Sequence, residues 1–206
     1  MATTAVVGRV RIERAFARAR GEARMAIVVY LTVGYPDRAS TPALLRAALE
    51  GGADVIELGV PFSDPLADGT TVQRASETAL RAGVTLTDCI AEGAALVRDV
   101  DAAVLLMGYT NPFLQRGYAR LASDLAAAGI SGAIVPDMPA EESGELDAAF
   151  APHGLVRIDL YAPTTPGERL AALLPKARGF VYCVSLTGVT GARPAVGAEV
   201  ADLVRR

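Results

Sequence analysis

A carboxylate lies inside an apolar, strand-like segment of this sequence, and two more follow in the adjoining loop. The stretch reads Glu57-Leu-Gly-Val-Pro-Phe-Ser-Asp-Pro-Leu-Ala-Asp-Gly69. Side chains alternate along a strand, so Glu57 shares one face with Val55, while Ile56 and Leu58 occupy the other. If both faces are covered, as in a parallel sheet, burial raises the pKa of Glu57 toward neutrality and lets it exchange protons near pH 7. The alternative is a glutamate at a strand end that reaches solvent or an arginine.

The two aspartates of the loop, Asp64 and Asp68, are less informative when each is taken alone. Pro61, Pro65 and Gly69 surround them, and in such a setting an aspartate usually forms a turn or caps a helix. A chemical role for either residue therefore depends on its position relative to Glu57.

Composition restricts the class of protein. The 206 residues are 51% hydrophobic and 21% charged, which predicts one globular domain over residues 1–206. The formal charge of -3 gives no broad basic field, so nucleic acid is a poor candidate partner. No apolar run approaches the roughly 18 residues that span a bilayer. These properties predict a soluble protein.

Several catalytic chemistries lack the residues that they need. His153 is the only histidine and lies in a predicted surface turn, which argues against histidine-ligated metal sites and against Ser-His-Asp catalysis. Lys176 is expected before a strand, opposite the usual active face of a β/α unit, so a Schiff base is not predicted. Cys89 and Cys183 are expected to be buried free thiols in a reducing cytoplasm. Proton transfer is left to carboxylates, tyrosines and the backbone.

Apolar runs rich in valine and isoleucine alternate with helical segments rich in alanine and leucine. Strands are expected to begin near Ala26, Asp54, Ala102, Ile130, Gly154 and Gly179. Helices are expected at Thr41–Glu50, Ala75–Arg98, Tyr118–Ala128, Ala140–Phe150 and Pro166–Leu174. Near the N-terminus, the arginines between Arg9 and Arg24 could indicate a transit peptide. Ile12, Phe16 and Ala19, however, form an apolar stripe at helical spacing, so we prefer an amphipathic N-terminal helix.

Six β/α units after an N-terminal helix predict the α/β class, specifically a (β/α)₈ TIM barrel. Such barrels usually have about 250 residues, so this chain is expected to stop two units early and to be incomplete at its C-terminus. An open doubly wound sheet is the rival fold. It is disfavoured because no Gly-x-Gly-x-x-Gly turn follows the first strand.

Polar residues recur where the predicted strands end, as at the active face of a barrel. Tyr109 and Asn111 follow the third strand, and Asp137 follows the fourth. Each could equally be a turn residue. Tyr182 lies on the sixth strand, where its hydroxyl could reach Glu57 or Asp68, although an aromatic core residue is the alternative. The glycine- and threonine-rich loop at residues 185–193 could fold over a ligand.

Taken together, these segments closely resemble the α subunit of tryptophan synthase. The motifs that carry the resemblance are Ile12–Phe16, Tyr30–Pro36, Glu57–Gly69, Asn111–Pro112, Pro136–Pro139 and Gly188–Gly191. The resemblance implies a (β/α)₈ lyase of tryptophan biosynthesis, which cleaves indole-3-glycerol phosphate into indole and glyceraldehyde 3-phosphate in a retro-aldol reaction.

The resemblance also assigns roles by position. Glu57 matches the catalytic acid and base that protonates indole C3, and Asp68 matches the aspartate that accepts the indole N–H bond. The remaining matches are substrate-binding residues, namely Tyr182, which orients the substrate, Tyr30, Met107 and Ile134 in the wall of the indole pocket, and Thr190 and Gly191 in the closing sixth loop.

The resemblance further implies a β subunit as partner, in a cytoplasmic α₂β₂ heterotetramer. Pro61 and Asp64 are expected near the interface. Pyridoxal phosphate would belong to the β subunit, and no cofactor or metal is expected in this chain.

Two departures from the family pattern bear on activity. Thr70 stands where the family commonly has proline, which removes a fixed φ from the loop. The seventh and eighth strands, with most of the phosphate-binding loops, have no counterpart before Arg206. Two alternatives therefore remain, namely a weak or inactive α chain that docks on the β subunit, or another phosphosugar lyase or isomerase.

Overall fold

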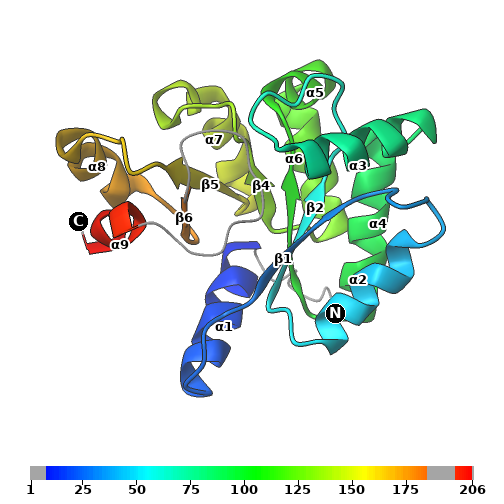
Figure 1. Cartoon of the computed structure of the whole chain (residues 1–206), viewed down its shortest axis with the longest axis horizontal. Helices are drawn as coiled ribbons and strands as arrows, with labels where there is room; N and C mark the ends of the chain where they lie inside the picture. The colour runs from blue at the N-terminus through cyan, green and yellow to red at the C-terminus, as the bar shows by residue number, and fades with distance from the viewer. Residues whose placement is uncertain (1–7, 185–197, 206) are drawn as a thin grey trace.

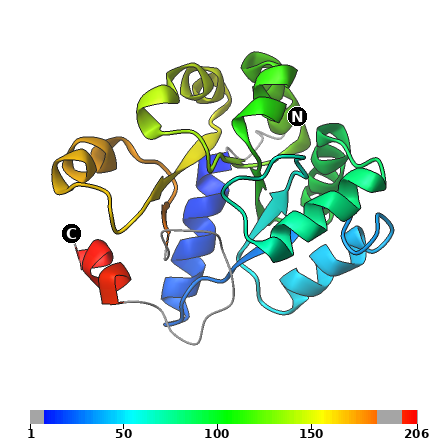
Figure 2. The same ribbon diagram turned by 45° about the horizontal axis from the view of Figure 1, so that its top comes forward.

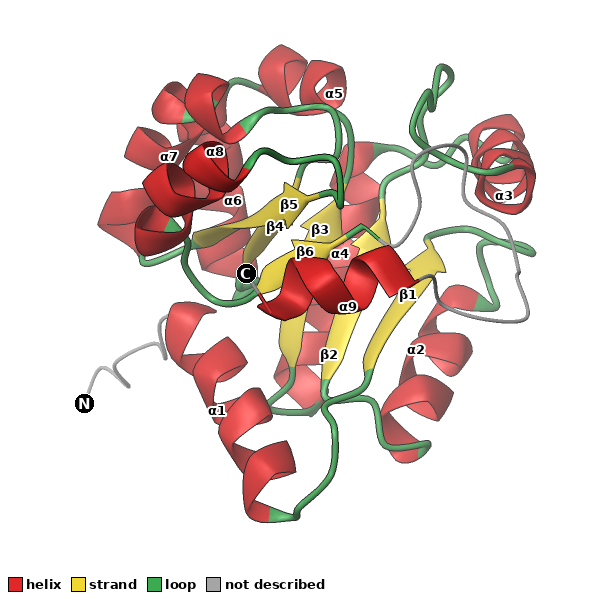
Figure 3. Cartoon of the chain, turned by 60° about the vertical axis from the view of Figure 1, so that its left-hand side comes forward, coloured by secondary structure: helices red, strands yellow, loops and turns green. Residues whose placement is uncertain are grey.

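The chain forms a curled, parallel β-sheet with helices along its outer face. In the computed structural model, residues 8–184 and 198–205 are described. Their strands follow one another in the sheet in chain order. Figure 1 shows the arrangement of the elements along the chain, and Figure 3 shows the strands in yellow. They are β1 (Val28–Thr32), β2 (Val55–Gly59), β3 (Ala103–Met107), β4 (Gly132–Ile134), β5 (Val156–Tyr161) and β6 (Val181–Cys183). A doubly wound sheet would reverse its strand order at a switch point, so the sequential order excludes that rival.

The helices that connect the strands lie around the outside of the sheet (Figure 2). The α-helices are α1 (Gly8–Gly21), α2 (Thr41–Glu50), α3 (Thr70–Arg81), α4 (Leu86–Asp99), α5 (Thr110–Arg116), α6 (Tyr118–Ala128), α7 (Gly144–Phe150), α8 (Gly167–Leu173) and α9 (Ala198–Arg205). Short 3₁₀ turns are η1 (Ala140–Glu142), η2 (Ala151–His153) and η3 (Leu174–Lys176). None of the helices in the described part of the chain is long and apolar enough to cross a membrane.

Alternating strand residues divide the apolar core into two layers. Ile56 and Leu58 pack outward, in the cluster that joins the sheet to its helices. Val55 packs inward, together with Ile12 and Ala103. Because Ile12 comes from α1 and the other two lie near the starts of β2 and β3, α1 covers the amino-terminal end of the half-barrel. The carboxyl-terminal end is left for the loops that follow the strands.

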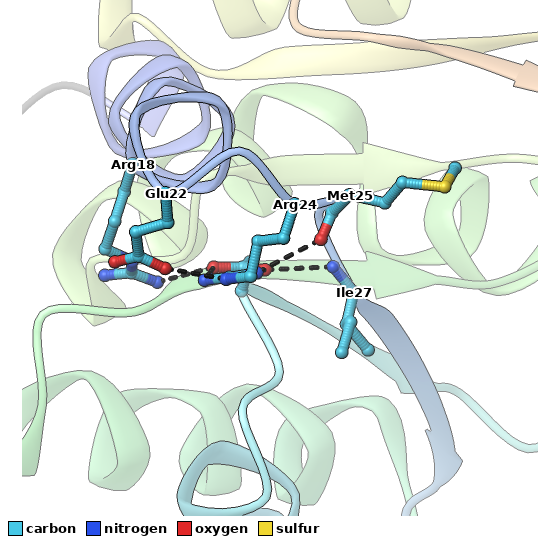
Figure 4. Close-up of polar contacts among 6 residues, drawn as sticks. Arg18, Glu22, Arg24, Met25 and Ile27 are labelled. Atoms are coloured by element: carbon cyan, nitrogen blue, oxygen red, sulfur yellow. Dashed lines mark hydrogen bonds and ion pairs between the residues drawn. The ribbon is translucent and has the colours of Figure 1, made fainter.

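A buried ion-pair cluster fastens the segment after α1 to the start of β2 (Figure 4). The Asp54 carboxylate is fully buried and lies 2.9 Å from Arg18 and 2.6 Å from Arg24. It also accepts a hydrogen bond of 2.9 Å from the Ile27 backbone N–H. These contacts, with the Arg24 hydrogen bond as the largest influence, hold the pKa of Asp54 well below its usual range.

Most of the predicted elements are present, but two of the predicted helices are each divided into two elements. Every strand begins within two residues of its expected start. The helix predicted over residues 75–98 is instead α3 and α4. The break falls at Gly83, which adopts a left-handed φ of 73°, and a capping box between Thr85 and Asp88 starts the second helix. The helix predicted over residues 140–150 is likewise divided into η1 and α7.

Candidate active site

Glu57 lies on the inner face of the half-barrel, in the middle of β2. It pairs in register with Tyr30 on β1 and Leu105 on β3, so strands cover both of its sides. The residue is 3% exposed, and none of the described residues donates a hydrogen bond to its Oε1. Burial raises the pKa of Glu57 to about 7. The expected burial and raised pKa are therefore confirmed, and the carboxyl group can both give and take a proton near neutral pH.

Asp68 lies at the end of the loop that follows β2, two residues before the start of α3. It is half-buried. Burial raises its pKa, while a hydrogen bond from the Tyr109 hydroxyl acts in the opposite direction. The loop thus places a second carboxylate, in a more polar setting, after the buried Glu57.

The base of this loop is joined to the neighbouring strand ends by backbone hydrogen bonds. The Val60 N–H donates to the Met107 carbonyl at 2.8 Å, and the Gly108 N–H donates to the Ile134 carbonyl at 3.1 Å. These bonds continue the ladder beyond the strands themselves. The ends of β2, β3 and β4 are therefore held at one level, as a shared site requires.

Tyr30 covers the inner face next to Glu57 because Gly59 leaves room for its ring. A Cβ at position 59 would overlap the Tyr30 hydroxyl and ring carbons. The hydroxyl lies 3.2 Å from Thr32 Oγ1. Burial raises the pKa of Tyr30 to about 12, so this hydroxyl stays protonated at neutral pH.

The structure brings together the other described wall residues. Met107 and Ile134 are partners in the β3–β4 register, and both pack in the inner cluster with Tyr182. Burial, followed by the negative charges of Glu57 and Asp68, raises the pKa of Tyr182. Its hydroxyl thus lies within the electrostatic reach of both carboxylates, and its ring contributes to the inner core.

The remaining predicted residues differ in what the structure says of them. Thr190 and Gly191 lie outside the described residues. Pro61 is buried at the base of the loop, whereas Asp64 is exposed near its tip. Asn111 is exposed on α5. Across residues 8–184 and 198–205, no three His, Cys, Asp or Glu side chains are grouped so as to hold a metal ion.

Tyr109 and Asp137 follow strands, as predicted, and the structure shows the partners of both side chains. The Tyr109 hydroxyl accepts a hydrogen bond of 2.9 Å from the Ala67 N–H. Asp137 accepts hydrogen bonds of 2.9 Å and 3.0 Å from the N–H and hydroxyl of Thr110, so it fixes the start of α5. The strand-end positions were visible in the sequence, but the partners were not, because they come from a different loop.

Comparison with known proteins decides the family. The family model of the tryptophan synthase alpha chain matches residues 16–206. The chain belongs to the tryptophan synthase alpha chain family. It is 58% identical to the tryptophan synthase alpha chain of Roseiflexus castenholzii, over 89% of this chain and 70% of the relative. It is 52% identical to that of Chloroflexus aggregans, over 94% of this chain and 73% of the relative.

Solved structures agree with the sequence relatives. A structure of Mycobacterium tuberculosis tryptophan synthase matches with a TM-score of 0.87 and 42% identity, over 95% of this chain and 76% of that one. The fold is therefore that of the TIM-barrel family. Its members are lyases that cleave indole-3-glycerol phosphate in tryptophan biosynthesis, and they work with a β subunit.

Proposed function

We propose that Glu57 and Asp68 perform the retro-aldol cleavage of indole-3-glycerol phosphate in this chain. The observation that supports the proposal best is the buried Glu57, whose Oε1 has no hydrogen-bond donor among the described residues. Burial raises its pKa to about 7. A carboxyl group of this acidity, with one buried oxygen that has no partner among the described residues, is suited to exchange a proton with a substrate.

Glu57 serves first as an acid and then as a base. Its carboxyl group gives a proton to C3 of the indole ring, which leaves a positive charge on the ring nitrogen. A proton then leaves the glycerol hydroxyl for the Glu57 carboxylate. The bond between C3 and the glycerol carbon breaks, its electron pair returns to the ring, and the hydroxyl carbon becomes the aldehyde. Protons balance, and the products are indole and glyceraldehyde 3-phosphate.

Asp68 stabilises the charge that forms on the indole nitrogen. Its ionised carboxylate accepts the indole N–H bond, and the attraction strengthens as the ring becomes positive. Tyr30, Met107 and Ile134 form walls of the indole pocket, and Tyr182 orients the substrate beside the two carboxylates. We also propose that Thr190 and Gly191 bind the substrate.

The loop after β2 also supplies the surface for the β subunit. Leu66 is 87% exposed at its tip, and Asp64 is exposed beside it. The buried Pro61 fixes the loop beneath them.

We place the assembly in the cytoplasm as an α₂β₂ heterotetramer. Multi-angle light scattering of the purified complex tests this stoichiometry, and a 1:1 heterodimer would refute it.

Indole release by Glu57→Gln tests the acid and base role. The assay uses the 206-residue chain and indole-3-glycerol phosphate, with and without a β subunit. We expect the substitution to abolish release, because an amide cannot transfer the proton. The control is Glu50→Gln, which changes an exposed glutamate at the end of α2. Release by Glu57→Gln at the rate of the unchanged chain would refute the role. A folded chain that binds the β subunit but releases no indole would support the docking module instead.

Asp68→Asn tests the electrostatic role separately. A neutral amide still accepts a hydrogen bond but cannot offset the charge on the protonated ring. We expect kcat to fall by roughly 100-fold, the magnitude found when one such stabilising group is removed. The exposed Asp64→Asn is the matched control on the same loop when the chain is assayed alone. Near-normal turnover by Asp68→Asn would remove Asp68 from the mechanism.

A further inference from the structure

One hydroxyl group holds two adjacent residues of the loop that carries Asp68. The Tyr109 oxygen accepts the Ala67 backbone N–H at 2.9 Å. The same hydroxyl is within reach of the adjacent Asp68 carboxylate and acts on its pKa as a hydrogen-bond donor. A tyrosine hydroxyl has one donor hydrogen and two acceptor lone pairs, so it can accept from the Ala67 N–H and donate to Asp68.

The Tyr109 ring is itself held in a fixed position. The residue is 5% exposed, and its ring stacks on Phe62 with ring centroids 5.2 Å apart. Phe62 belongs to the first part of the loop, and Ala67 belongs to the last part. Tyr109 therefore contacts the loop at both of its ends, through its ring at one and through its hydroxyl at the other.

The segment that carries Tyr109 is fixed by its neighbours. Tyr109 directly precedes α5, whose first residue, Thr110, is bonded to Asp137 after β4. Gly108 before it is packed closely, because a Cβ there would lie 2.9 Å from the Phe113 ring and 3.1 Å from Val60. The hydroxyl thus extends from a junction of β3 and α5 that these contacts hold in place, toward the loop that carries Asp68.

We propose that Tyr109 is the positioning residue that aims the Asp68 carboxylate at the substrate. The inference rests on the proposed function, because it matters to catalysis only if Asp68 acts on the indole nitrogen. Tyr109 acts through Asp68 and is not assigned any contact with the reacting atoms. Its hydrogen bond favours the ionised form of Asp68 that the charge-stabilising role requires. Its bond to Ala67 fixes the backbone from which that carboxylate extends.

The test compares Tyr109→Phe with the unchanged chain by NMR, without substrate. Phenylalanine keeps the ring on Phe62 and removes only the hydroxyl. Titration of ¹³C-labelled aspartate carboxyls, with Asp68→Asn to assign the signal, reports the Asp68 pKa. Hydrogen exchange reports the Ala67 amide. We expect the Asp68 pKa to rise in Tyr109→Phe and the Ala67 amide to exchange faster. An unchanged titration and an unchanged exchange rate would overturn the inference.

The matched control is Tyr161→Phe. Tyr161 is 3% exposed at the end of β5, and its hydroxyl has no hydrogen-bond partner among the described residues. The control removes a buried tyrosine hydroxyl of the same kind from outside the candidate site. We expect it to leave the Asp68 titration and the Ala67 exchange unchanged. An equal shift in this control would show that the Tyr109 effect is general loosening, and it would overturn the inference.

Turnover then separates this inference from the proposed function. We expect kcat for indole release to fall roughly 10- to 100-fold in Tyr109→Phe, the loss that a misplaced catalytic group produces. The acid limb of the pH profile should also move upward, following Asp68. If Asp68→Asn impairs turnover but Tyr109→Phe does not, the positioning role is wrong while the function stands. If Asp68→Asn has no effect, the function of Asp68 fails, and the NMR titration still decides whether Tyr109 holds it.

Discussion

At the scale of single residues, the fold buries the Glu57 carboxyl group, whose ionised form is more stable in water. Glu57 lies between two strands with one carboxyl oxygen unpartnered among the described residues. An ordinary surface glutamate would be ionised at pH 7 and a weak acid. Burial makes Glu57 a proton donor near neutral pH, and it does so at the expense of the folded state. That relation between acidity and stability can be measured.

Glu57→Gln should become more stable relative to the unchanged chain as the pH rises from 4.5 to 7. The folded pKa of about 7 lies above the ordinary value of 4.5. Within this window the unfolded chain releases a proton that the folded chain keeps, so rising pH favours unfolding. The shift corresponds to about 3 kcal/mol. Glutamine does not titrate, and the difference in free energy of unfolding should widen by about that amount.

Urea unfolding of both proteins at pH 4.5, 5.5, 6.5 and 7.5 measures this difference. Glu50→Gln, which removes an exposed carboxylate at the end of α2, is the control. A constant difference between Glu57→Gln and the unchanged chain would show that the Glu57 pKa is the same in the folded and unfolded states.

At the scale of elements, the cluster around Asp54 connects α1 and the segment after it to β2. The carboxylate is fully buried, whereas the Arg18 and Arg24 side chains are 53% and 35% exposed. Solvent therefore screens the arginines, and most of the contribution comes from the hydrogen bonds that satisfy a buried acceptor. Because Ile12 of α1 packs in the inner core, this cluster also helps to hold α1 against the amino-terminal end of the half-barrel.

Asp54→Asn should lower the free energy of unfolding by about 1 to 3 kcal/mol at pH 7, the usual contribution of hydrogen bonds to a charged group. The folded pKa of Asp54 is depressed, so its contribution is present above the unfolded pKa of 3.8 and is lost as the pH falls below it. Thermal or urea unfolding at pH 7 measures the loss. The control is Asp101→Asn, whose side chain is 64% exposed beside Arg11 and Arg14 and should matter by less than about 1 kcal/mol. Equal effects of the two substitutions would contradict the importance of the Asp54 cluster.

The same elements show how far the sequence could predict the structure. The strands can be predicted because short runs of valine and isoleucine are a local sequence pattern that indicates buried strands. The break between α3 and α4 was missed, although Gly83 and the Thr85–Asp88 capping box were both visible in the sequence. Glu57 could be predicted as buried because it interrupts an apolar strand. The partners of Tyr109 could not, since its bonds to Ala67 and Asp68 join loops that are distant along the chain.

At the scale of the whole molecule, the described sheet is a half-barrel with two edge strands, β1 and β6. Met25 is 87% exposed and Ile27 47% exposed before β1, and Val28 at its start is 37% exposed. An exposed apolar edge carries unpaired backbone groups that can pair with another chain. We therefore expect copies of the isolated 206-residue chain to associate through these edges in solution.

Val28→Lys should therefore reduce self-association of the purified chain. Lysine on an edge strand opposes edge-to-edge pairing, because bringing two copies together would bury its charge. Light scattering over a series of concentrations measures the weight-average mass, and we expect the concentration at which it rises to increase several-fold. The control is Leu114→Lys, which places the same charge on α5, at a residue 53% exposed and away from the edges. If both substitutions reduced association equally, charge rather than the β1 edge would explain the effect. If neither did, association through β1 would be refuted, and the exposed edge would be compatible with a monomer that presents its site freely.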